Sequence, residues 1–268
     1  MKSCMVTCSF LAALMLLWVA PVLAEDGAAA GQVQPAQAVK AGALSAEEIM
    51  RRMDKNMSGY ADQYMKVKLT VYSKELGDRE VFFEVWQKGG DKRLIHFLQP
   101  GNMRDMKVLI QDHDHMYVYL PSQKRVRRTA ANNMKQGFAG SDFTNEDMAT
   151  ASYADDYAGT LAKEDAEAYY IKAVPRPTVK SDYEYLELKV RKDNFNLVQI
   201  LFFKGGKAVK AMRNTDLITW PNGETRAKKV VMEDLLTGHR SQLDLDEFKT
   251  NQGYDENMFT SRYLQWGR

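Results

Sequence analysis

Cysteine is almost absent from this chain of 268 residues, and the positions of the two cysteines make the absence more complete. Cys4 and Cys8 both lie in residues 1–24, which we expect to be removed as a signal peptide. The rest of the chain contains no cysteine. Disulfide bonds, zinc sites built from thiolates and cysteine nucleophiles are therefore excluded from the cleaved protein.

A strong charge of either sign is also missing. The chain has 37 Lys and Arg against 35 Asp and Glu, which gives a formal net charge of +2. Proteins that bind nucleic acid usually carry a strongly basic patch or stripe. We therefore predict no nucleic-acid partner.

Recognisable catalytic motifs are missing as well. The chain has no G-x-S-x-G elbow and no glycine-rich phosphate loop, and its spacing assembles no Ser-His-Asp arrangement. His113-Asp114-His115 is the densest group of metal-ligating residues, but a strong site needs three or four convergent ligands. We predict no catalytic residue, no cofactor and no metal site, and a hydrolase or metal enzyme using His113 and His115 remains a distant alternative.

The N-terminal segment has the pattern of an export signal. Lys2 is the only charge in residues 1–24, and Phe10–Ala20 is an apolar run too short for a comfortable membrane span. Pro21 ends this run, and small or aliphatic residues precede a cleavage site that we place after Ala24. An uncleaved membrane anchor is the less favoured alternative. Residues 25–44 are rich in Ala, Gly and Gln and predict a flexible leader before a single domain over residues 45–268.

The domain begins with a helix and continues with many short strands. Ser45 and Glu48 form a capping-box pattern for a helix that we expect to end near Met57. Strict alternation of apolar and polar residues then recurs between turn signals, which predicts about ten to twelve antiparallel strands. Residues 148–165 read as one or two short helices inserted among them. The fold class is mainly β (α+β), a barrel or strongly curved sheet.

Several of the predicted strands are apolar on both faces. Phe82 and Trp86 oppose Val81, Phe83 and Val85, and the run around Ile95 and Phe97 is similar. A sheet with one solvated face alternates more cleanly. The second face is therefore covered, either by helices of the same chain or by a ligand.

A short basic strand follows the turn at Pro121-Ser122. Its charged residues are Lys124, Arg125, Arg127 and Arg128. They are candidates for contact with anionic headgroups or with a protein partner. The alternative, slightly favoured, is an edge strand whose charges prevent pairing with another sheet.

Four motifs taken in order resemble one known family. They are YLPSQKRVRR at residues 119–128, GFAGSDFTNEDM at 137–148, LVQILFFKGGKAVKAM at 197–212 and GYDENMFTSRYL at 253–264. Together with the export signal and the capped first helix, they resemble the LolA-like outer-membrane lipoprotein-sorting family. That resemblance implies a half-closed antiparallel β-barrel with helices covering an apolar cavity on its concave face.

The resemblance also implies a function. A member of the family would be a periplasmic carrier of acyl chains of lipoproteins or lipids, moving them towards the outer membrane. It would have an inner-membrane transporter as donor, an outer-membrane acceptor and transient contact with membranes. If the alternating faces point inward, the cavity is lined by Val67, Leu69, Val71, Val81, Phe83, Val85, Leu94, Met106, Val108, Ile110, Met116 and Val118.

A second class of function stays open beside the carrier. The chain would then be a binding or assembly module of the cell envelope that docks a membrane transporter through residues 124–128. Dependence of that docking on salt and on Arg125 or Arg127 would distinguish it from a carrier.

Overall fold

The computed structural model describes residues 44–112, 115–129, 131–150 and 152–266, without the side chains of residues 131 and 132. All of them belong to one unit of the chain, Lys40–Arg268. The predicted signal peptide and residues 25–43 of the predicted leader lie outside the described residues.

The first helix forms where the capping pattern places it. Helix α1 spans Ala46–Ser58, and the Ser45 hydroxyl accepts a hydrogen bond from the Glu48 backbone N–H over 3.2 Å. The Glu48 carboxylate accepts instead from Arg52 Nε, so only the first half of the predicted capping box is present. Ile49, Met50 and Met53 are buried on one stripe of the helix.

The described strands form one antiparallel sheet of thirteen strands, which is not closed. A mainly β fold with an incompletely closed antiparallel sheet is therefore confirmed, with more strands than the predicted ten to twelve. The strands are β1 Asp62–Val71, β2 Arg79–Lys88, β3 Lys92–Gln99, β4 Lys107–Asp112, β5 His115–Leu120, β6 Arg125–Arg128, β7 Tyr157–Glu164, β8 Ala168–Pro175, β9 Tyr185–Arg191, β10 Leu197–Lys204, β11 Lys207–Thr219, β12 Thr225–Asp234 and β13 Arg240–Thr250.

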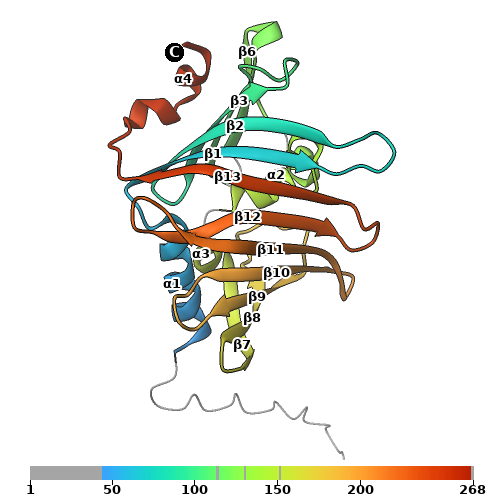
Figure 1. Cartoon of the computed structure of the whole chain (residues 1–268), viewed down its shortest axis with the longest axis vertical. Helices are drawn as coiled ribbons and strands as arrows, with labels where there is room; N and C mark the ends of the chain where they lie inside the picture. Colours follow the sequence, from blue (N-terminus) through green and yellow to red (C-terminus); the bar gives the residue numbers. More distant parts are fainter. Residues whose placement is uncertain (1–43, 113–114, 130, 151, 267–268) are drawn as a thin grey trace, which may run out of the picture. The chain divides into compact units, whose positions relative to one another are not determined.

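The sheet consists of two meanders joined in the middle. Strands β1 to β6 run outward to one edge, β7 to β13 return from the other, and β1 pairs with β13 (Figure 1). The chain therefore has to cross from the β6 edge to the β7 edge. Residues 129–156, of which 130 and 151 are not described, make this connection. We call it the crossing segment.

Part of the predicted helical insertion is wrong. Within residues 148–165, helix α2 (Asn145–Ala149) and helix α3 (Tyr153–Asp156) are short, and Tyr157–Glu164 is strand β7. The Ala-rich sequence favours a helix locally, but β7 pairs with β8 along its whole length. Pairing with a neighbouring strand overrides local helix propensity here.

The sheet is apolar on both faces because the chain covers both. The larger core includes Val108 of β4 and Ile171 of β8, so the sheet curves around it, and we call this its inner face. A smaller core lies on the outer face, where Leu94 and Leu109 contact Phe259 and Leu264. Phe259 lies in the 3₁₀ helix η4 (Glu256–Phe259) and Leu264 in helix α4 (Ser261–Trp266). Among the described residues, no helix is both long and apolar enough to span a bilayer.

The outer core gives a direct test of the role of the C-terminal segment. Leu264 is fully buried, so Leu264→Ala should lower the free energy of unfolding by about 2–5 kcal/mol. Leu236→Ala, at a leucine that is 71% exposed, should change it by about 0.5 kcal/mol or less. Urea unfolding of both variants measures the difference, and equal effects would contradict the packing described here.

Candidate functional site

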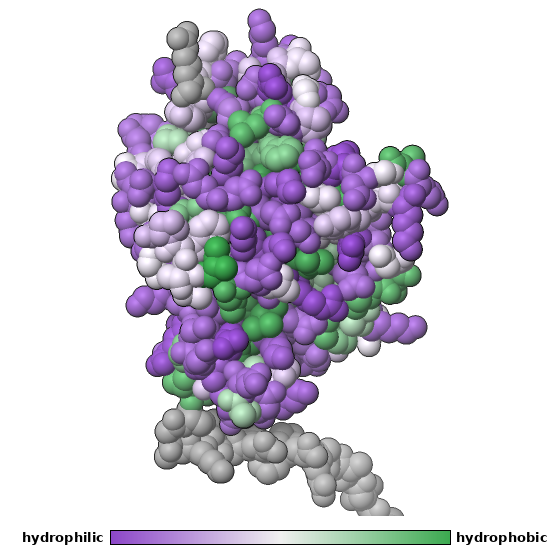
Figure 2. All heavy atoms as spheres, viewed as in Figure 1, coloured by the Kyte–Doolittle hydropathy of each residue, from purple (hydrophilic) through white to green (hydrophobic). Residues whose placement is uncertain are grey.

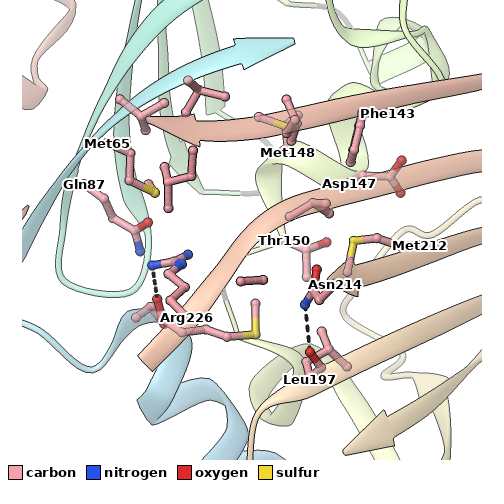
Figure 3. Close-up of a pocket in the computed structure, with 18 of the residues that line it drawn as sticks. Met65, Gln87, Phe143, Asp147, Met148, Thr150, Leu197, Met212, Asn214 and Arg226 are labelled. Carbon is pink, nitrogen blue, oxygen red and sulfur yellow. Dashed lines mark hydrogen bonds between the residues drawn. The ribbon is translucent and has the colours of Figure 1, made fainter. Parts of the chain in front are cut away.

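An apolar cavity of about 220 Å³ lies between the inner face of the sheet and the crossing segment (Figure 3). Its walls come from α1, the crossing segment and strands of both meanders. The lining residues include Met65, Val67, Phe83, Val85, Ile95, Phe143, Met148, Leu197, Phe202, Met212, Leu217, Val230, Leu243 and Leu245. Polar and charged side chains also line it, among them Gln87, Thr150 and Asn214, so the cavity combines apolar walls with polar groups as ligand pockets do.

The crossing segment is held against the inner face by aromatic packing. Phe138 lies in the 3₁₀ helix η3 (Phe138–Gly140), 5.8 Å from Phe83 and 5.6 Å from Phe97 between ring centroids. Phe143 is buried in the same core. The GFAGSDFTNEDM motif therefore supplies the apolar side chains that cover this part of the sheet.

The same motif anchors the crossing segment to the sheet with polar contacts. Arg79 of β2 donates from Nη2 to the carbonyl of Ala139 over 2.7 Å. The Asp142 carboxylate accepts from the Ser241 hydroxyl over 2.5 Å and lies 2.8 Å from His239 Nδ1. These contacts reach the segment from β2 and from the start of β13 with the turn before it.

The most buried of these anchors is an ion pair. Lys210 Nζ of β11 lies 2.5 Å from Asp147 Oδ2 of α2, and the two side chains are 9% and 7% exposed. Lys210 also donates to the carbonyl of Asp142 over 3.1 Å. Asp147 completes a capping box with Thr144 at the start of α2. The pair thus connects the fold of the crossing segment with its position on the sheet.

Two further carboxylates are buried at the ends of the segment. Asp54 of α1 accepts from the Ser152 hydroxyl and from the Ala154 N–H, over 2.9 and 2.7 Å. Glu146 of α2 accepts from the Ser181 hydroxyl over 2.6 Å. Burial raises the pKa of both carboxyl groups, and these hydrogen bonds oppose the increase. Their role is to tie the segment to α1 and to the loop before β9.

Arg93 of β3 connects the cavity wall to the crossing segment. Its guanidinium donates to the carbonyls of Met148 over 2.5 Å and Thr150 over 3.1 Å, and to Gln87 Oε1 over 3.0 Å. Burial lowers the pKa of Arg93 to about 10, so the group stays charged at neutral pH. All three of these acceptors are uncharged.

The twelve residues predicted to line a cavity divide into three groups. Val67, Phe83 and Val85 line the cavity itself. Leu69, Val71, Val81, Met106, Val108, Ile110, Met116 and Val118 belong to the same inner core or pack against it. The prediction for Leu94 is wrong, because Leu94 pairs with Leu109 on the outer face under α4, and its neighbour Ile95 takes the inner position. The assignment of these residues to lipid binding stays a prediction.

Sequence reasoning missed the half of the cavity that β10 to β13 provide. Leu243 alternates with its polar neighbours Gln242 and Asp244, whereas Met212 follows Ala211 and Val230 precedes Val231, so the alternation is weaker there. It also missed Arg93 and Arg226, charged residues in strands that face the cavity. A charge on the inward side of an alternating strand is the signal that could have identified them.

The basic residues lie where the alternative interpretation places them. Strand β6 is an edge strand, and Lys124, Arg125, Arg127 and Arg128 are exposed. Arg127 donates to Gln123 Oε1 over 2.7 Å. This position suits a charged edge that prevents sheet-to-sheet pairing. It also leaves the strand accessible, so partner contact through it stays a prediction.

Of the two histidines in the His113-Asp114-His115 group, His113 lies outside the described residues. His115 Nδ1 lies 2.7 Å from Asp112 Oδ1. Within the part of the chain that the structure describes, no group of three or more His, Cys, Asp or Glu side chains could hold a metal ion.

The comparisons with known proteins agree with this architecture. A family model described as "-like: Uncharacterized protein" matches residues 89–266, more than half of the chain, and the chain belongs to that family. A search of curated proteins found no match.

Three solved structures share the fold. A domain assigned to outer membrane lipoprotein sorting, from Vibrio parahaemolyticus, is 21% identical with a TM-score of 0.74, over 82% of this chain and 98% of that one. A DUF1329 family protein from Desulfovibrio piger is 22% identical with a TM-score of 0.75, over 82% and 98%. A LolA superfamily protein from Nitrosomonas europaea is 21% identical with a TM-score of 0.70, over 82% and 100%. The predicted resemblance is confirmed, and the chain has the LolA-like fold.

The buried ion pair can be tested by its stability. Lys210→Met leaves the Asp147 carboxylate buried without its partner and should lower the free energy of unfolding by about 3–5 kcal/mol. Adding Asp147→Asn removes that charge and should recover part of the loss. Urea unfolding of the single and double variants gives the coupling energy. Simple additivity of the two effects would show that the pair does not act as described.

Proposed function

We propose that this protein is a periplasmic carrier that holds an acyl chain of a lipid or lipoprotein in the inner-face cavity and moves it towards the outer membrane. The observation that carries the proposal is the apolar cavity under the crossing segment of a LolA-like fold. The protein has no catalytic role in this proposal. The predicted signal peptide supports export to the periplasm.

The size of the cavity bears on how cargo enters. Its volume of about 220 Å³ is below the range of about 300–1,000 Å³ that is usual for ligand pockets. A long acyl chain therefore needs the crossing segment to move. Each methylene transferred from water to an apolar site contributes about 0.8 kcal/mol, so one or two chains can offset the loss of its contacts. Empty protein is closed, and cargo displaces the segment.

Contact with membranes, needed for loading and delivery, has a candidate surface. The β1–β2 and β12–β13 turns lie side by side, because Val71 of β1 pairs with Ser241 of β13. Their tips expose Leu76 at 92% and Leu236 at 71%. Figure 2 shows hydrophobic atoms at the ends of these hairpins and further ones in the middle of the same view. The exposed leucines suit transient insertion into a membrane surface, and Lys74 and Lys207 are exposed near them alongside the acidic Glu75 and Asp78.

The exposed basic edge strand is the basis for a second candidate function, the docking of an envelope transporter. Strand β6 would dock an envelope transporter through Arg125 and Arg127, as an assembly module does. The cavity has no role in that function, so lipid loading separates the two proposals.

The residue to mutate in a test of the cavity is chosen by how deeply its side chain is buried. A charge at Phe83, one of the residues predicted to line the cavity, would disrupt the core, because Phe83 is 1% exposed and contacts Phe97 and Phe138. Met212 is only partly buried and lines the cavity (Figure 3). Met212→Glu should leave the protein folded and reduce its bound lipid at least severalfold.

The readout is mass spectrometry of an organic extract of protein purified from the periplasm. Thr215→Glu is the matched control, because Thr215 lies on the same strand, is exposed and alternates to the other face. Folding of both variants is checked by thermal unfolding. Wild-type lipid content in folded Met212→Glu would contradict the carrier proposal.

The membrane surface has its own test. Leu76→Ser with Leu236→Ser should weaken binding to vesicles that contain phosphatidylglycerol by about tenfold or more, because two apolar side chains no longer leave water. Ile218→Ser is the control, since Ile218 is exposed at the opposite end of the sheet, near the β11–β12 turn. Vesicle co-sedimentation measures binding. Equal binding by the wild type and the double variant would rule out this surface.

A further inference from the structure

The cavity carries more positive than negative charge. Among the described residues that line it, the cations are Arg93, Arg226 and Lys228, and the one carboxylate is that of Asp147. Asp147 is already paired with Lys210, which is not a lining residue. An apolar cavity for an uncharged chain has no need of this excess.

Arg226 of β12 resembles Arg93 in its partners. Its Nη1 donates to Gln63 Oε1 over 2.8 Å and to the carbonyl of Met57 over 3.3 Å, both uncharged acceptors. The guanidinium carbon lies 4.9 Å from the centre of the Phe248 ring. Neither Arg93 nor Arg226 has a carboxylate within 4.0 Å in the described part of the chain.

The two guanidinium groups also act on each other. Burial lowers the pKa of both groups, and the charge of Arg226 lowers that of Arg93 further, while the charge of Asp91 opposes the decrease. Arg93 and Arg226 are both partly buried, and like charges partly buried together without a paired carboxylate destabilise a fold. Hydrogen bonds to carbonyl and amide oxygens compensate in part, and an anion would compensate fully, because charge-assisted hydrogen bonds are about twice as strong as neutral ones.

A cavity with apolar walls and cationic groups suits a ligand that has an apolar chain and an anionic headgroup. We propose that the cargo is a single-chain amphiphile with an anionic headgroup, a carboxylate or a phosphate, which binds Arg93 and Arg226 while its chain occupies the apolar part of the cavity. This inference rests on the proposed carrier function and adds the chemical class of the cargo.

The contacts of Arg93 suggest how binding and opening are connected. Its partners on the crossing segment are the carbonyls of Met148 and Thr150. An anionic headgroup competes with these neutral oxygens for the same N–H groups and is the stronger acceptor. Binding of the headgroup therefore releases the segment at the point where the chain has to enter. A neutral lipid lacks this advantage.

The test compares three ligands with the same chain and different headgroups. Binding of palmitate, hexadecyl phosphate and hexadecanol to the delipidated full-length mature protein is measured by isothermal titration calorimetry. Wild-type protein should bind one or both anions roughly ten- to a hundredfold more tightly than hexadecanol. Which anion binds more tightly identifies the source of the headgroup.

Substitutions test whether the two arginines cause the preference for anionic ligands. Arg93→Gln with Arg226→Gln should abolish the preference for anions, measured within that variant as the ratio of its affinity for palmitate or hexadecyl phosphate to its affinity for hexadecanol. Arg213→Gln is the matched control, because Arg213 is exposed and pairs with Glu233 away from the cavity. It should keep the full preference. The wild-type comparison of the three ligands decides the matter if the double variant fails to fold.

Each failure has a separate meaning. Equal binding of hexadecanol and the two anions by wild-type protein would overturn the anionic headgroup and leave the carrier proposal standing. Inorganic phosphate bound as tightly as hexadecyl phosphate would also overturn it, because the site would then recognise a free anion. Absence of binding by all three ligands would overturn this inference together with the proposed function.

Discussion

This structure depends on one constraint: the chain has to connect β6 and β7, which lie at opposite edges of one open sheet. Strands β6 and β7 are consecutive along the chain and lie at the two ends of the strand order. The chain between them crosses the inner face, so a loop becomes the cover of the core. Its anchors, from Arg79 to Lys210, come from strands that are far apart in sequence. The cavity exists because this cover touches the sheet at its anchors and leaves space between them.

The electrostatics of the inner face follow from the same constraint. A segment with polar backbone that crosses an apolar surface needs partners for its buried groups. Lys210 supplies a counterion for Asp147, and Arg93 supplies donors for the carbonyls of Met148 and Thr150. The first contact joins two opposite charges, whereas the second leaves a cation with neutral partners. In the proposed carrier the crossing segment has to open for cargo. Its contact with Arg93 suits this, because a stronger hydrogen-bond acceptor can displace the two carbonyls.

Many individual strands could be predicted because alternation is a local property. Residues 65–71 alternate clearly, they form a strand, and its apolar members Met65, Val67, Leu69 and Val71 face the core. The prediction failed at Leu94 and in residues 157–164. Leu94 lies in a strand that is apolar on both faces, so alternation gives no inward direction. Residues 157–164 favour a helix locally, and only pairing with β8 makes them a strand.

The sequence by itself determined the export signal pattern, the capped first helix, the antiparallel strands and three residues of the apolar lining, because each depends on neighbours within a few residues. The tertiary structure decided the rest. It brought β10–β13 opposite β1–β3, placed α4 over the outer face and set Arg93 and Arg226 in one cavity. Residues 93 and 226 are separated by most of the domain along the chain. Only the β1–β13 pairing brings their strands together, and no local pattern encodes that contact.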